Sequence, residues 1–322
     1  MQYIFEAALH NQTEVIKEYL KFGNVNATDD SKMSLLHYAV MGNAIEVANL
    51  LLDNYANLNI KNNKGETPLF LAVIKGEVGF AKLLCRFGAD VNATNNLNES
   101  VYFKAIIKGN KAIVDLLEDT TQIDYELVND NGENILHYYL KIHNDKLFIN
   151  LAEKFPKLIN QKDCNNANLL MLAIKHDNYQ ITKYLLDKGF NIYECDFLNN
   201  NSLFYAAKYA SCDILRLLLD KKPIIAGKNK NGLDIFDLSK ENTHPTEVLL
   251  DNYKNSYDYL QYVRTYPFHV AVVARNYDLL EYANIDIKKR DIYGLLIIDY
   301  IEMVNDKIIN KIFNIKPKFL KY

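Results

Sequence analysis

Apolar residues recur three and four positions apart in short stretches of the chain, the spacing of one face of an α-helix. Val47, Leu50 and Leu51 are one example, and residues 181–186 contain another. These stretches come in pairs of about ten residues each, separated by polar turns. One such pair cannot cover its own apolar face, so it is stable only when stacked between neighbouring pairs. The pattern therefore predicts an all-α fold of stacked helix-turn-helix units.

The pairs repeat along the whole chain. A residue, usually small, that closes the first apolar stretch of each pair recurs at intervals of 30 to 34 residues. These markers are Ala39, Ala72, Ala105, Tyr139, Ala173, Ala207, Ser239, Ala271 and Ile301, with Ala7 in a shortened opening unit. A fixed period of this length is typical of a solenoid. We expect about nine to ten units.

The repeated motif resembles the ankyrin repeat, which opens with T-P-L-H-x-A and ends with G-A-D-V-N. The best matches are Thr67-Pro68-Leu69 with Ala72, and the segment 88–92, GADVN. Partial matches are Leu36-His37 with Ala39, Leu136-His137, and His269 with Ala271. The family's His is replaced by Asp237 and Asp299, and its Ala by Ser239 and Ile301. The resemblance implies an ankyrin-repeat solenoid with short hairpin fingers.

We expect the 322 residues to form a single ankyrin-repeat domain with four parts. Residues 1–29 would be an N-terminal capping unit and residues 30–240 regular repeats. Residues 241–304 would be degenerate repeats, and residues 305–322 a C-terminal cap helix followed by a basic tail. Terminal units of a solenoid differ from the others because one of their faces meets water.

The turns of the chain are rich in Asn. The chain has only 12 Gly but 39 Asn. Asn tolerates the left-handed backbone region that these turns require. We expect Asn98, Asn166 and Asn200 to replace Gly in fingers, and Asn43 to replace it between helices. An AT-rich genome, which favours Asn, Ile, Lys and Tyr codons, would also explain the excess.

Composition excludes several classes of protein. No apolar stretch approaches the 18 residues of a membrane span, and the first residues lack the features of a signal peptide. The four scattered cysteines, Cys85, Cys164, Cys195 and Cys212, predict thiols in a reducing, cytoplasmic compartment. The net charge of -3 argues against a general nucleic-acid binder.

No catalytic motif is present, so we expect no enzyme, no cofactor and no metal site. His37, His137 and His269 occupy the repeat's own His position, where the family uses imidazole to bond turn backbone between units. The other four His, at positions 10, 143, 176 and 244, have no Cys or carboxylate partners at ligand spacing. An active site assembled across repeats stays open as an alternative.

The candidate binding surface is the concave face formed by finger tips and first helices. Residues at the ends of the first helices pair an apolar group with Lys in several units. This set comprises Met41, Ile74, Lys75, Ile107, Lys108, Lys141, Lys175, His176 and Tyr209, and the finger tips add Asn63, Lys64 and Glu66. The apolar members would contact a partner and the lysines its acidic groups. Alternatively, each Lys complements the dipole of its own helix.

A second feature is the Tyr-rich segment 252–282, which coincides with the least regular repeat. Tyrosine is common at interfaces because its rigid apolar ring carries a polar end. The alternative is that these rings fill the space left by a distorted unit.

These observations favour a non-enzymatic protein-protein interaction module, monomeric when free. Its composition resembles that of intracellular bacteria or large DNA viruses, so one hypothesis is an effector delivered into a host cell. A second hypothesis is a neutralising protein that masks a toxin or enzyme. A third is a nucleic-acid or anionic-lipid binder that uses the Lys stripe.

Overall fold

A computed structural model describes residues 2–120, 123–282 and 285–314. Within them the fold is all-α, as predicted, with isolated bridges in place of a sheet. The chain divides into two compact units, residues 1–142 and 143–322. The first contains α1 (Gln2–Leu9), α2 (Thr13–Leu20), α3 (Leu35–Met41), α4 (Ile45–Asp53), α5 (Pro68–Lys75), α6 (Val78–Arg86), α7 (Val101–Lys108), α8 (Lys111–Glu118) and α9 (Ile135–Lys141).

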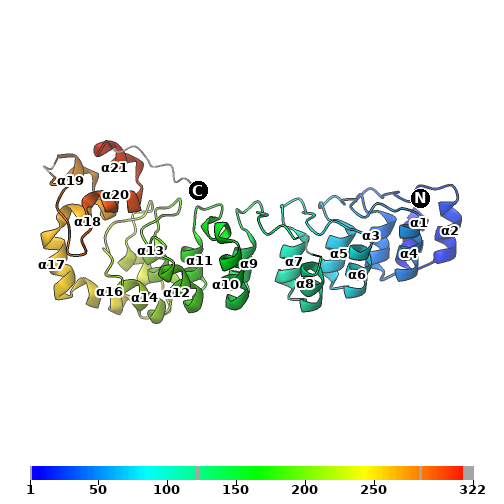
Figure 1. Ribbon diagram of the computed structural model, residues 1–322, viewed down its shortest axis with the longest axis horizontal. Helices are drawn as coiled ribbons and strands as arrows, with labels where there is room; N and C mark the ends of the chain where they lie inside the picture. The colour runs from blue at the N-terminus through cyan, green and yellow to red at the C-terminus, as the bar shows by residue number, and fades with distance from the viewer. Residues whose placement is uncertain (1, 121–122, 283–284, 315–322) are drawn as a thin grey trace. The chain divides into compact units, whose positions relative to one another are not determined.

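The second unit contains the remaining helices (Figure 1). They are α10 (Asp145–Lys154), the 3-10 helix η1 (Pro156–Asn160), α11 (Leu169–Lys175), α12 (Tyr179–Asp187), α13 (Ser202–Tyr209), α14 (Cys212–Leu219), α15 (Ile235–Ser239), α16 (Thr246–Lys254), α17 (Tyr257–Thr265), α18 (Pro267–Ala274), α19 (Tyr277–Tyr282), α20 (Ile297–Val304) and α21 (Lys307–Ile312). No helix in the described part is long and apolar enough to span a bilayer. Most of the expected basic tail, residues 315–322, lies outside the described residues.

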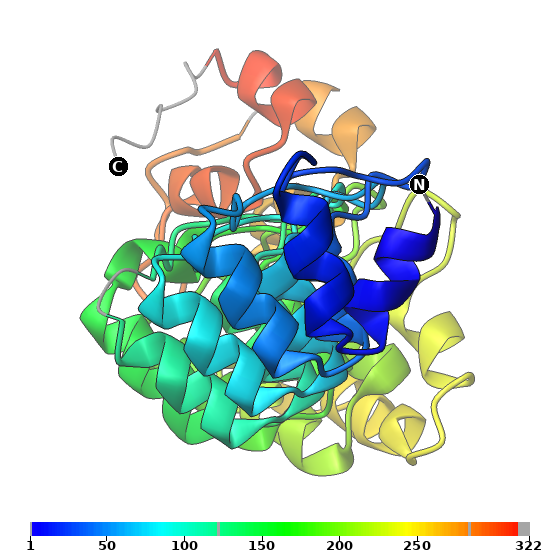
Figure 2. The ribbon, with the colours of Figure 1, turned by 90° about the vertical axis from the view of Figure 1, so that its right-hand side faces the viewer.

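The first helices of successive pairs pack against one another and form the core of each unit. In the first unit α1, α3, α5, α7 and α9 follow one another in this way, as Figure 2 shows for the blue and cyan helices. All of the periodic marker residues from Ala7 to Ile301 are buried. The period in the sequence is therefore the period of the core.

Each regular first helix begins at a polar N-cap. The side chains of Ser34, Thr67 and Ser100 accept the backbone N–H three residues on, and Asn134, Asn168, Asn201 and Asp234 cap later helices in the same manner. His37 Nδ1 accepts the backbone N–H of Ser34, while its Nε2 lies 3.0 Å from the carbonyl oxygen of Glu66 in the next repeat. The predicted His bond between repeats is confirmed here. Asp237 and Asp299 accept the same N-cap N–H with a carboxylate.

One Asp or Asn shapes every finger. Its Oδ1 accepts the backbone N–H groups two and four residues later, at 2.7–3.0 Å, and so closes the turn. We call these the finger Asx residues: Asp29, Asn62, Asn95, Asn129, Asp163, Asp196, Asn229 and Asp291. Backbone bonds also join successive finger tips, such as Asn63 N–H to Ser31 O.

The residue three positions after each finger Asx has a left-handed backbone. Asn98 and Asn166 take this conformation, as predicted, and so does Asn43 between helices. The prediction for Asn200 was wrong, because Asn199 has the positive φ of 61°. Because Asp196 closes this finger, the left-handed residue is the third one after it, Asn199. Asn200 instead donates its backbone N–H to Asp196.

A helix replaces one finger in the second unit. Consecutive finger Asx residues are 33 or 34 positions apart, but Asn229 and Asp291 are 62 apart. The position where the missing Asx would stand is Tyr262, inside α17. After this helix, α18 to α21, which we call the C-terminal hook, lie beside the loops that follow α12 and α14 (Figure 1).

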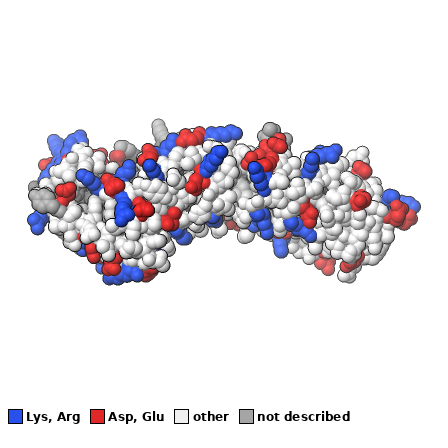
Figure 3. Space-filling model, turned by 90° about the horizontal axis from the view of Figure 1, so that it is seen from below, with Lys and Arg blue, Asp and Glu red and all other residues white. Residues whose placement is uncertain are grey.

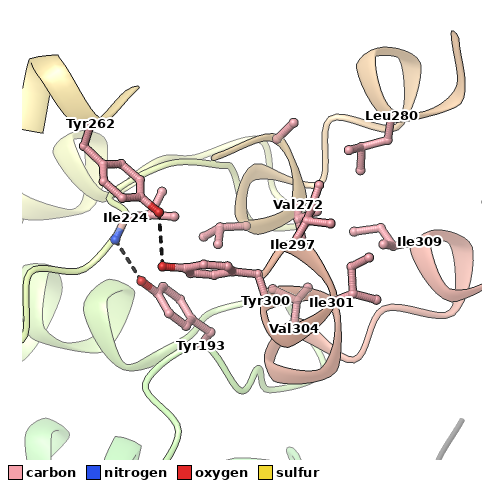
Figure 4. Close-up of a cluster of buried hydrophobic side chains, with 12 residues drawn as sticks. Tyr193, Ile224, Tyr262, Val272, Leu280, Ile297, Tyr300, Ile301, Val304 and Ile309 are labelled. Carbon is pink, nitrogen blue, oxygen red and sulfur yellow. Dashed lines mark hydrogen bonds between the residues drawn. The ribbon is translucent and has the colours of Figure 1, made fainter. Parts of the chain in front are cut away.

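Tyrosines hold the hook in place. Asp291 is buried, and its Oδ2 accepts the hydroxyls of Tyr262 and Tyr300 at 2.8 Å each. Figure 4 shows Tyr262, Tyr300 and Tyr193 converging beside the aliphatic side chains of the hook. Among the described tyrosines of the Tyr-rich segment, Tyr262 is buried and Tyr253, Tyr259, Tyr266 and Tyr277 are half-buried, so the segment contributes to the core of the second unit.

Buried histidine should make folding sensitive to mild acid. Burial lowers the pKa of His37, and its Nδ1 already accepts a hydrogen bond. Below about pH 6.5 the unfolded chain therefore binds a proton that the folded chain does not. We expect the melting temperature to fall as the pH decreases from about 7, and to fall less steeply in His37→Asn. In an exposed control, His10→Gln, the melting temperature should depend on pH as it does in the wild type. The same pH dependence in all three proteins would show that His37 does not cause the loss of stability.

The carboxylate of Asp291 should matter more than that of an ordinary finger Asx. In Asp291→Ala four donors lose their acceptor, two backbone N–H groups and two tyrosine hydroxyls. We expect a loss of about 2–4 kcal/mol in the free energy of unfolding, measured with urea. Asp163→Ala, which removes two backbone bonds at a half-buried position, should cost about half as much. Equal losses would show that the tyrosine bonds add nothing.

Candidate functional site

In each unit the finger tips and the ends of the first helices form a surface that we call the finger groove. In the first unit it contains a hollow of about 510 Å³. Its lining residues are Asn63, Lys64, Glu66, Ile74, Asn95, Asn96, Leu97, Glu99, Lys104 and Lys108. Most of them are polar or charged, and Lys104 pairs with Glu99 at 3.0 Å. This hollow suits a partner with polar and charged groups.

The second unit has a hollow at the corresponding repeat positions, with a volume of about 380 Å³. Its lining residues are Asn165, Asp196, Phe197, Leu198, Asn200, Phe204, Tyr205, Lys208, Tyr209, Asn229, Asn231, Leu233 and Leu238. Phe197 and Leu198, at a finger tip, are 59% and 48% exposed. Isolated exposed apolar residues are ordinary, but adjacent ones beside an aromatic hollow favour an interface.

Electrostatic contacts orient the polar groups of this second hollow. Tyr205 donates its hydroxyl to Asp196 Oδ2, and burial together with this carboxylate raises the pKa of the phenol. Lys208 pairs with Glu241 at 2.9 Å, and this hydrogen bond raises the pKa of the ammonium group. The hollow therefore presents a neutral phenol and a lysine that is already paired.

The structure brings six of the predicted site residues to these hollows. Asn63, Lys64, Glu66, Ile74 and Lys108 line the first, and Tyr209 lines the second. Sequence reasoning missed several members of both hollows, namely Leu97, Glu99, Lys104, Phe197, Leu198 and Lys208. Leu97, Phe197 and Leu198 stand one or two residues after a finger Asx, and this spacing could have identified them as lining residues.

The other predicted residues lie outside the hollows. Met41 and Ile107 are partly exposed, and Lys175 is exposed. Lys75 Nζ donates to the carbonyl of Met41, the last residue of a neighbouring helix, at 2.7 Å. Lys75 therefore complements the C-terminus of α3, whereas the alternative stated above placed each Lys at the C-terminus of its own helix. The ring of His176 lies edge-on to His143, with centroids 6.4 Å apart.

Lys141 makes an internal ion pair. Its ammonium lies 2.6 Å from Glu133 Oε1 and 5.3 Å from the centre of the Tyr138 ring. Burial alone would raise the pKa of Glu133, but the bonds from Lys141 and Asn129 outweigh it and lower the pKa. Lys141 is therefore committed to its own repeat.

Within the described residues, no cluster of three or more His, Cys, Asp or Glu side chains could hold a metal ion. A profile for ankyrin repeats (three copies) matches residues 4–95 and 140–234, more than half of the chain. The chain belongs to the ankyrin repeat family. Ankyrin repeats are a protein-interaction module, and the paired helices and fingers described above are its structural units.

Individual relatives are similar to parts of this ankyrin chain. The phosphocholine transferase AnkX of Legionella pneumophila is 28% identical over 54% of the chain, and a protein of Rickettsia bellii named as an ankyrin repeat protein is 27% identical over 46% of it. A mimivirus protein named in the same way is 37% identical over 19% of the chain. The matched regions span 17% of the Legionella protein, 86% of the Rickettsia protein and 28% of the mimivirus protein.

The ion pair of Lys141 can be tested by titration. In Lys141→Met, burial acts on Glu133 with less opposition, so we expect the pKa of its carboxyl to rise. Carbon-detected NMR over a pH series would measure it. Lys175→Met, an exposed lysine at the end of another first helix, should leave the Glu133 titration unchanged. A Glu133 pKa that is the same in all proteins would show that Lys141 does not control it.

Proposed function

We propose that this ankyrin chain is a non-enzymatic binding module whose finger groove holds a protein partner. The observation that carries the proposal is the pair of hollows at equivalent repeat positions, one lined mainly by charged and polar groups and the other by aromatic and aliphatic groups beside polar ones. Protein surfaces supply partners for either lining, charged and polar side chains for the first hollow and apolar ones for the second.

The charge distribution gives no support to the anionic-ligand hypothesis. On the face drawn in Figure 3, Lys and Arg are interspersed with Asp and Glu in both units. Nucleic-acid and anionic-lipid binders gather basic groups on one face or along one stripe. A protein partner fits such a mixed surface better.

The organisms of the relatives bear on where the module acts. Two are bacteria and one is a large virus, the kinds of source that the composition suggested. They support the hypothesis of an effector that binds host proteins in a cytoplasm. A neutralising protein that masks a partner from its own cell is the alternative, and it would use the same groove. Transferase chemistry belongs to the Legionella protein, and our proposal for this chain is binding alone.

Capture of partners from host and source-cell lysates, quantified by mass spectrometry, tests the groove. We expect Lys64→Glu/Lys108→Glu, and separately Phe197→Ser/Tyr209→Ser, to reduce the captured partner at least about fivefold. The melting temperature should stay near that of wild type because these side chains are largely exposed. Lys82→Glu/Lys183→Glu, on the exposed sides of second helices, is the matched control. Capture that all variants preserve equally would rule out the groove.

A further inference from the structure

The loop that leaves the second helix has the same geometry in several repeats of this chain, although Leu158 and Ile224 stand at the equivalent positions of two others. An Asn or Asp stands five residues before the finger Asx, and its Oδ1 accepts the N–H two residues later at 2.9 Å. These residues are Asn24, Asn57, Asp90, Asp124 and Asn191, and Asp286 makes the same bond at 3.0 Å. We call this side of the repeats the exit edge. Because the carbonyl oxygen of the Asn side chain is used internally, its Nδ2 can bond to something else.

The second unit provides an example of what an exit edge binds. Asn191 Nδ2 donates to the backbone carbonyl of Met303 at 2.7 Å. Met303 lies in the last turn of α20, where backbone carbonyls have no partner within the helix. Lys221 and Lys222 line the same crevice as Met303 and suit the negative end of the helix. The exit edge of this unit therefore binds the C-terminal end of an amphipathic helix.

Apolar contacts complete this docking. Tyr193, two residues after Asn191, lies beside Tyr300 of α20, with ring centroids 6.2 Å apart, in the same buried cluster as Ile297 and Ile301 (Figure 4). Its hydroxyl also accepts the backbone N–H of Ile224 in the next repeat at 2.9 Å. In the first unit Asn59 accepts the equivalent N–H, that of Asp90, at 3.0 Å. Tyrosine thus keeps the bond between repeats and adds a ring for the docked helix.

The exit edge of the first unit carries aromatic rings in water. Phe22 is 96% exposed and Tyr55 is 91% exposed. Tyr55 has a φ of 60°, at the position that later repeats fill with Gly88 and Gly189. A bulky residue is strained in this region, and strain of this kind recurs at functional sites. A strained and exposed tyrosine is unfavourable for the free protein, which favours a binding role.

These rings belong to one continuous surface. Asn57 N–H donates to Asn26 Oδ1 at 2.7 Å, so the loops that carry Phe22 and Tyr55 lie side by side. The next loop adds Phe87, which is 44% exposed. Within the described part of the chain, the Nδ2 groups of Asn24 and Asn57 make no hydrogen bond. The edge therefore offers a row of aromatic rings beside two amide donors.

We propose that the exit edge of the first unit, residues 22–26 and 55–59, docks the C-terminal end of an amphipathic α-helix from a partner protein. Asn57 and Asn24 donate to carbonyls of its last turn, as Asn191 does to Met303. Phe22 and Tyr55 cover its apolar face. This interface is separate from the finger groove, so the chain binds proteins through two surfaces.

The test uses the full chain and a fluorescent, hydrocarbon-stapled peptide with the sequence of residues 295–306, which contains α20. The exit edge of the second unit already binds α20 of the same chain, whose effective concentration is high, so the added peptide cannot displace it. The exit edge of the first unit is therefore the site available to the peptide. We expect saturable binding by fluorescence anisotropy. Phe22→Ser/Tyr55→Gly should weaken it at least about tenfold, and Asn57→Asp about threefold or more.

The chain itself provides the controls. Gly stands at the position of Tyr55 in two later repeats, and Asp stands at that of Asn57 in three others, so both variants keep a backbone that the repeat already adopts. Leu97→Ser and Lys108→Glu, in the finger groove, should leave peptide affinity unchanged. Equal affinity in all variants, or no saturable binding, would overturn the proposal. Self-association in sedimentation velocity that Tyr55→Gly abolishes would assign the edge to a second copy and also overturn it.

Discussion

This solenoid depends on one interaction within each finger. The side-chain oxygen of the finger Asx accepts hydrogen bonds from two backbone N–H groups of the same finger. It closes the finger and sets the position of the left-handed residue that follows. It also places the next N-cap, at Thr67 in the finger of Asn62, so that the first helix begins in register. Without it each finger would have unpaired N–H groups and the helices that follow would have no fixed starting point.

Where that interaction is missing, the stack changes direction. Tyr262 occupies the expected position of a finger Asx, and the segment around it forms α17. Its hydroxyl then bonds to the carboxylate of Asp291, the Asx of the following finger. The hook is thus held by the same kind of acceptor that shapes each finger, now shared with tyrosines from two helices.

The same repetition explains how one scaffold carries the two surfaces that we propose for binding. Residues just after the finger Asx line the groove, and residues five to seven positions before it line the exit edge. Neither set is needed to close the finger, so these positions vary between repeats without loss of the fold. Aromatic finger tips in the second unit and aromatic exit edges in the first are two outcomes of this freedom.

The period, the paired helices, the buried markers and the all-α class were determined by the sequence alone, because apolar spacing and turn residues act over a few neighbouring positions. The use of Asn98 and Asn166 as left-handed turn residues was also predictable, whereas the prediction for Asn200 is one residue late because three Asn, 199–201, follow one another there. Only the tertiary structure decided which side chains line the hollows, and that Lys75 and Lys141 bond to neighbouring groups of the protein. It also decided that Asn191 meets Met303, 112 residues away. Such contacts depend on how whole units pack, and no local pattern encodes them.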